Sequence, residues 1–101
     1  MKSLPLRLLG TMMLLSHHAM GEALPGPDKA IPNAVNALSA PSLAGVPESI
    51  TTAVSTTSEA AQSHVKCGLS HLHFGWEFEA CRHFAAAIRE DPECMIAHWG
   101  M

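Results

Sequence analysis

Composition and charge set the first limits on this chain. It has 101 residues, six Lys or Arg against nine Asp or Glu, and a formal net charge of −3 at pH 7. A nucleic-acid-binding protein needs a stripe of Lys and Arg that displaces counterions from phosphate. Basic residues this few and this scattered cannot form such a stripe, so we expect no nucleic-acid partner.

Residues 1–21 have the layout of a secretory signal peptide. Lys2 and Arg7 give a positive start, and a short apolar run follows at 8–15. An uncleaved membrane anchor would need about 20 continuous apolar residues, and this run is too short. We therefore expect an exported protein, periplasmic or secreted, that is not stably inserted in a membrane once the signal is removed.

Small residues offer two cleavage sites, one after Gly21 and one after Ala23. Cleavage removes Lys2 and Arg7 and no acidic residue, which leaves four basic and nine acidic residues and a net charge of −5. The predicted mature chain is therefore mildly acidic.

The next segment, 22–56, is rich in Ala, Ser, Thr, Val and Pro. Its prolines are spaced too closely for a long helix: Pro25, Pro27, Pro32, Pro41 and Pro47. All five aromatic residues lie in the last third of the chain, so this part has few large groups to bury. We interpret it as a low-order linker, either a plain tether or a spacer, with a possible helical turn at 33–38 and a short strand at 50–54 that have no partner.

Regular helix is predicted from 57 onward. Thr56 and Glu59 have the spacing of a capping box, and Gly75 can adopt the left-handed conformation that ends a helix. Between them, apolar or small residues recur at steps of three and four: Ala61, Val65, Gly68, Leu69 and Leu72.

A second helix is predicted over 77–90, with Ala80, Phe84, Ala87 and Ile88 on one stripe. Pro92 ends it, because proline disfavours helical conformation in the residue before it. A third helix then begins near Cys94. The fold class is therefore all-α, with a helix-turn-helix hairpin at the C-terminal end, after the signal peptide and linker.

The hairpin resembles a tetratricopeptide repeat, and more narrowly the repeats of secreted or periplasmic bacterial proteins. The resemblance covers about a third of the chain and is carried by Gly68, Leu69, Leu72, His73, Gly75, Glu79, Ala80, Phe84, Ala87, Asp91, Pro92, Cys94, Met95, Ala97, Trp99 and Gly100. His64 and Cys67 stand where the general pattern has an aromatic and a bulky residue. Trp76 and Phe78 flank the usual position of a single aromatic.

The resemblance implies a right-handed solenoid whose first helices line a groove for a protein or peptide partner. The groove positions it implies are Gln62, Val65, Leu69, Leu72 and His73. The apolar periodicity offers another interpretation, in which Val65, Leu69 and Leu72 pack against the second helix and only Gln62 and His73 remain free. No residue set has the spacing of a catalytic site, so we predict a non-catalytic scaffold with no cofactor.

The sequence stops early in a second repeat. One repeat cannot cover its own apolar face, so we expect either a fragment of a longer repeat protein or self-association through the Trp99 surface.

A rival interpretation is a small periplasmic metal-binding or redox protein. Cys67 with His71, and Cys94 with His98, are each four residues apart on a predicted helix, which lets two side chains reach one metal ion. No CxxC motif is present. In an oxidising compartment Cys67 and Cys81 could form a disulfide that leaves Cys94 free.

Overall fold

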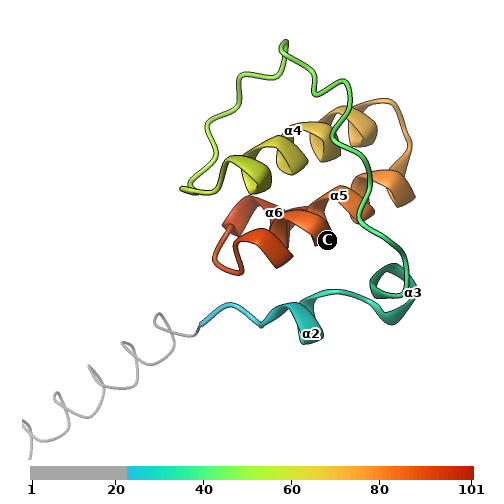
Figure 1. Ribbon diagram of the computed structural model, residues 1–101, viewed down its shortest axis with the longest axis vertical. Coiled ribbons are helices and arrows are strands. Elements are labelled where there is room, and N and C mark those ends of the chain that lie inside the picture. Colours follow the sequence, from blue (N-terminus) through green and yellow to red (C-terminus); the bar gives the residue numbers. More distant parts are fainter. Residues whose placement is uncertain (1–22) are drawn as a thin grey trace, which may run out of the picture.

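The computed structural model describes residues 23–101, and the regular secondary structure of this part is entirely helical (Figure 1). The expected signal peptide, 1–21, lies outside the described residues. The helices are α2 (Pro27–Ala30), α3 (Asn33–Asn36), α4 (Glu59–His73), α5 (Glu77–Glu90) and α6 (Met95–Gly100). The helical fold and its C-terminal hairpin, formed by α4 and α5, confirm the predicted fold class.

The start of α4 differs from the sequence prediction. The N-cap residue is Ser58, whose Oγ accepts a hydrogen bond from the backbone N–H of Ala61 at 3.1 Å. The hydroxyl of Thr56 donates instead to the carboxylate of Asp91, just beyond α5, at 2.5 Å. The Thr56 oxygen also accepts from the N–H of Ser58 at 3.1 Å. Because Ser58 is the N-cap and Glu59 the first helical residue, the predicted capping box of Thr56 and Glu59 is wrong.

The turn between α4 and α5 forms around Gly75, as predicted. Gly75 has a φ of 78°, a conformation that side chains with a Cβ rarely adopt. Its N–H donates to the carbonyl of Leu72 at 3.2 Å, and the N–H of Trp76 donates to that of His71 at 2.9 Å. This pair of bonds is the Schellman motif, which satisfies the last carbonyls of a helix and reverses the chain.

The ring of Phe84 joins three helices at the centre of the core. Phe84 on α5 is fully buried, and both Gly68 on α4 and Gly100 on α6 lie directly against its ring. Only a residue without a side chain permits so close an approach. Phe84 therefore contacts both α4 and α6 and helps to set their relative position.

The segment 27–39 packs on α5, which the prediction of a low-order linker did not anticipate. Ile31 and Val35 are buried in the hydrophobic core. The guanidinium of Arg82 donates to the carbonyl of Ser39, and that of Arg89 donates to the side-chain oxygen of Asn36. The predicted helical turn at 33–38 thus forms as α3, and it has a partner.

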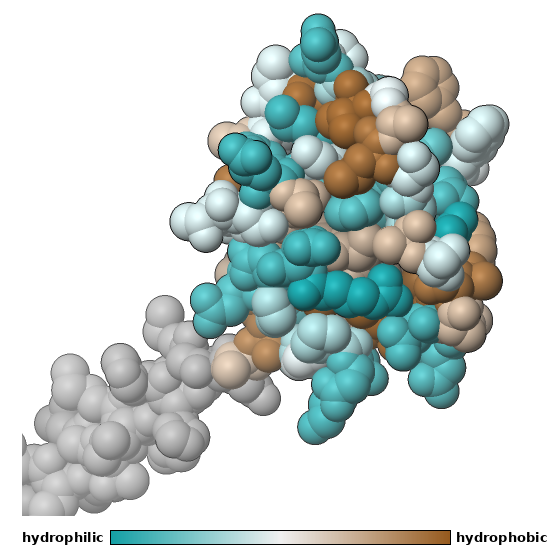
Figure 2. Space-filling view, viewed as in Figure 1, coloured by the Kyte–Doolittle hydropathy of each residue, from teal (hydrophilic) through white to brown (hydrophobic). Residues whose placement is uncertain are grey.

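The rest of the expected linker, 40–56, arches past α4 before the chain enters that helix (Figure 1). Residues 51–56 have no regular secondary structure, so the short strand expected at 50–54 does not form. Figure 2 shows hydrophobic residues gathered near the top of the view, where the arch passes in front of α4, on a surface that is otherwise mostly hydrophilic.

Candidate functional site

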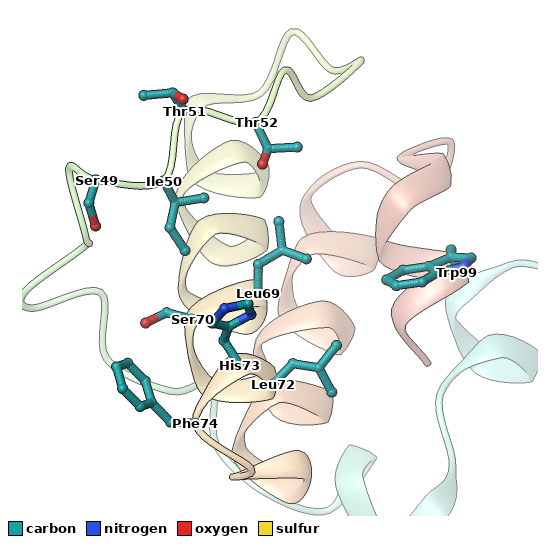
Figure 3. A pocket seen from close by; sticks show the side chains of 10 residues that line it. All are labelled: Ser49, Ile50, Thr51, Thr52, Leu69, Ser70, Leu72, His73, Phe74 and Trp99. Atoms are coloured by element: carbon teal, nitrogen blue, oxygen red, sulfur yellow. The ribbon is translucent and has the colours of Figure 1, made fainter.

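An open cavity of about 600 Å³ lies between α4, α6 and the arched segment (Figure 3). We call it the α4–α6 groove. It is lined by Ser49, Ile50, Thr51, Thr52, Leu69, Ser70, Leu72, His73, Phe74 and Trp99.

The helical repeat explains why α4 contributes one wall of the groove. Val65 and Gly68 point into the core and are buried. Leu69 and Leu72 follow Val65 by four and seven residues, so they continue the same stripe toward the C-terminal end of α4. Together with His73 they face the cavity in Figure 3. The apolar stripe of α4 is therefore buried at Val65 and Gly68 and opens into the groove one to two turns later.

Large apolar side chains around the groove remain exposed to solvent. Leu72 is 38%, Phe74 78% and Trp99 71% exposed. In Figure 3 Trp99 projects from α6 and lies across the groove from the α4 residues. Exposed apolar side chains that gather around a concavity mark interaction sites more often than isolated ones do.

The arched segment forms the remaining wall of the groove. A second cavity of about 560 Å³ adjoins the groove and is lined by Thr52, Ala53, Ser55, Leu69, Met95, Ile96 and Trp99. Both cavities share Thr52, Leu69 and Trp99. The segment 49–55 therefore lies across an apolar surface that α4 and α6 provide together.

The chemistry of the groove is that of a binding surface for uncharged groups. Within the described chain, none of its lining residues is Asp, Glu, Lys or Arg. Its polar side chains are the hydroxyls of Ser49, Thr51, Thr52 and Ser70, together with the His73 imidazole. Such a surface binds apolar side chains and offers hydrogen bonds from its rim.

The predicted groove residues separate into two groups. Leu69, Leu72 and His73 line the cavity. Val65 is fully buried in the core, and Gln62 is half-buried without lining the cavity. The sequence prediction missed the contributions of Phe74, Trp99 and the segment 49–52. The signal for the last of these was the β-branched run beginning at Ile50.

The predicted repeat positions lie as a hairpin requires. Gly68, Ala80, Phe84 and Ala87 are buried, Gly75 forms the turn, and Pro92 is exposed just after α5. The nearest atoms to Gly68 belong to Phe84, although Ala80 was expected opposite it.

The four residues considered as metal ligands do not form a common site. Cys67 and Cys94 are buried in the core, His71 stacks on Trp76, and Nε2 of His98 lies 2.7 Å from the carbonyl oxygen of Pro92. Between residues 23 and 101, no three His, Cys, Asp or Glu side chains are placed to share a metal ion.

All three cysteines are free thiols, so the bridge considered between Cys67 and Cys81 is not formed. Burial raises the pKa of Cys67, Cys81 and Cys94. Thiols are nucleophiles and metal ligands only when deprotonated, so this shift makes all three less reactive.

A buried histidine pair between α4 and α5 was not predicted. Nδ1 of His64 lies 3.0 Å from Nδ1 of His83, so one ring donates its proton to the other. The ring of His71 stacks on His83 at 5.2 Å between centroids. Burial lowers the pKa of His83 to about 4, with a further lowering from His64 and His71. Burial also lowers the pKa of His64.

No family model, curated protein or solved structure matches this chain. Across the described residues, every helix is too short or too polar to cross a bilayer.

Proposed function

We propose that the protein is a non-catalytic interaction scaffold of the tetratricopeptide type that binds a protein or peptide partner in the α4–α6 groove. The observation that carries this proposal is the exposure of Leu72, Phe74 and Trp99 around one concave surface. Burying such side chains contributes roughly 25 cal/mol for each Å² of apolar surface removed from water. A partner that covers them would therefore gain affinity.

The rigidity of the groove supports the same proposal. Its two helical walls, α4 and α6, are held through the Phe84 ring, which contacts Gly68 and Gly100. A groove whose walls are fixed before binding costs less conformational entropy when a partner arrives. Exported localisation, periplasmic or secreted, is part of the proposal and rests on the signal-peptide layout of 1–21.

A peptide selection tests the function. The mature chain is immobilised and challenged with a displayed library of random peptides, and the affinity of each enriched peptide is measured by fluorescence anisotropy. The test variant is Leu72→Glu, which places a charge at the groove. The matched control is Phe78→Glu, because Phe78 is 58% exposed but does not line the groove.

We expect enriched peptides to bind the mature chain and the Phe78→Glu variant equally, and the Leu72→Glu variant at least about tenfold more weakly. Circular dichroism checks that both variants keep their helices. A library that yields no binder, or binders indifferent to Leu72→Glu, would contradict the proposal.

A further inference from the structure

We propose that the partner in the α4–α6 groove is an extended, uncharged peptide segment with apolar side chains at alternate positions, and that its main chain pairs with the main chain of residues 49–53. This inference rests on the proposed function and specifies the conformation and chemistry of the partner.

The first support is an open main-chain edge beside the groove. Ile50 donates to the carbonyl of Pro47 at 3.4 Å, and the Val54 carbonyl accepts from Thr56 at 2.9 Å. Between these bonds, the backbone groups of Thr51, Thr52 and Ala53 have no hydrogen bond to another described residue. Extended backbone with unpaired N–H and C=O groups is a template for an added strand.

The second support is the way this segment already lies on the helices. Ile50 and Val54 are half-buried, whereas the three residues between them, Thr51, Thr52 and Ala53, are exposed. Ile50 and Val54 therefore hold the segment against the helices and leave the main chain between them at the surface. Val54 packs against the hydrophobic core. The surface of α4 and α6 thus accepts β-branched side chains from a segment without regular secondary structure.

The third support is the character of the surface next to that edge. Ser49, Ile50, Thr51 and Thr52 share the groove with Leu69, Leu72 and Phe74 of the α4 side. An added strand in the groove would therefore pair with 49–53 along one edge and place alternate side chains on apolar groups. The absence of Asp, Glu, Lys and Arg from the described lining favours an uncharged segment.

The probe is a fluorescein-labelled synthetic peptide with the sequence of residues 49–55, SITTAVS, acetylated and amidated to remove the terminal charges. Its isoleucine and valine are four residues apart and therefore lie on one face of an extended chain. Two N-methylated versions block hydrogen bonding along one edge or along the other. A fourth peptide carries Lys in place of its isoleucine and valine.

We expect the parent peptide to bind the mature chain, the lysine peptide not to bind, and one of the two N-methylated peptides to bind about fivefold or more weakly than the other. Equal affinity of both N-methylated peptides and the parent would overturn the pairing.

The peptide could bind in two ways: it could pair with the main chain of residues 49–53, or it could displace residues 49–55 and take their place on the helices. Variants of the protein distinguish these two modes. Thr51→Pro and Thr52→Pro each remove one backbone N–H, and neighbouring N–H groups of an extended chain point to opposite edges. Pairing predicts that one of the two variants binds the parent peptide about fivefold more weakly. Displacement predicts that both variants bind as well as the wild type or better, which would overturn the proposal.

Hydrogen exchange adds a direct readout, because pairing should slow the exchange of amides within 51–53 when the peptide is bound. Unchanged exchange there would overturn the proposal, as would failure of the parent peptide to bind. If sedimentation showed instead that a second copy of the chain occupies the groove, the partner assignment would be wrong.

The two proposals fail separately. If the peptide binds, is sensitive to Leu72→Glu and is indifferent to N-methylation and to both proline variants, the scaffold function holds and main-chain pairing is wrong. If its binding is indifferent to Leu72→Glu, the groove is not the binding site and both proposals are wrong.

Discussion

Gly68 and Gly100 lie against the two sides of the Phe84 ring. A Cβ atom at Gly68 would lie 2.8 Å from Cε1 of that ring, and one at Gly100 would lie 2.5 Å from Cδ2. Both distances are too short for non-bonded carbon atoms. The two glycines thus set how closely α4 and α6 can approach α5.

Replacing Gly68 with alanine should destabilise the protein by about 1–3 kcal/mol, the usual range for overpacking. The gain of about 1 kcal/mol from helix propensity opposes this loss but does not cancel it, because Phe84 is fully buried and cannot move freely. Urea denaturation of the mature chain measures the effect. In a Phe84→Leu background the same substitution should be harmless. An equal loss in both backgrounds would show that the ring is not the cause.

Lowering the pH should lower the free energy of unfolding, because the buried His64 and His83 bind protons more weakly in the folded chain than in the unfolded chain. The pKa of His83 falls from 6.5 to about 4 on folding, so the unfolded chain binds more protons between these values. Stability is therefore full above pH 6.5 and declines as the pH falls toward 4, by roughly 2–3 kcal/mol. Urea denaturation from pH 7.5 to pH 4 tests this. The His83→Gln variant should show a flatter profile, and an unchanged profile would contradict the assignment.

The segment on α5 should contribute to stability. Ile31 is 3% exposed, whereas Leu38 in the same segment is 42% exposed. Replacing Ile31 with alanine should cost about 2 kcal/mol, at the low end for such changes because the segment lies at the edge of the core. Leu38→Ala is the control and should cost much less. A plain tether would instead make both substitutions equally neutral.

The cap of α4 can be tested with neighbouring hydroxyl residues. Ser58→Ala removes the side-chain oxygen that accepts from Ala61 and should cost about 1 kcal/mol. Thr57 is exposed and has no such bond among the described residues, so Thr57→Ala should be nearly neutral. Thermal unfolding of both variants gives the comparison. A larger loss of stability for Thr57→Ala than for Ser58→Ala would indicate that Ser58 is not the N-cap of α4.

Local rules were sufficient for the hairpin but not for its surroundings. The steps of three and four from Ala61 to Leu72 and the special conformation of Gly75 are short-range signals, and α4, its turn and α5 form as they indicate. The packing of Ile31 and Val35 on α5 is a contact between distant segments. A hint was present in the unbroken apolar run at 85–88, since a helix that is apolar on every side must be covered on every side.

The candidate site was predicted in part for the same reason. Leu69, Leu72 and His73 follow from the helical face of α4. The contribution of 49–52 depends on where the arched segment lies relative to α4. The hydrogen bond from Thr56 to Asp91, which holds the end of that segment, connects residues 35 apart in the sequence. The histidine pair, His64 and His83, likewise needs the register of two helices, which periodicity alone does not supply.

The most direct test of the scaffold function is a chemical-shift map of the mature chain with a peptide taken from the library selection. We predict that the amides of 69–74 and the indole N–H of Trp99 shift on titration, since these groups line the α4–α6 groove. Shifts confined to the hairpin tip around Trp76 and Phe78, with Trp99 unaffected, would contradict the account.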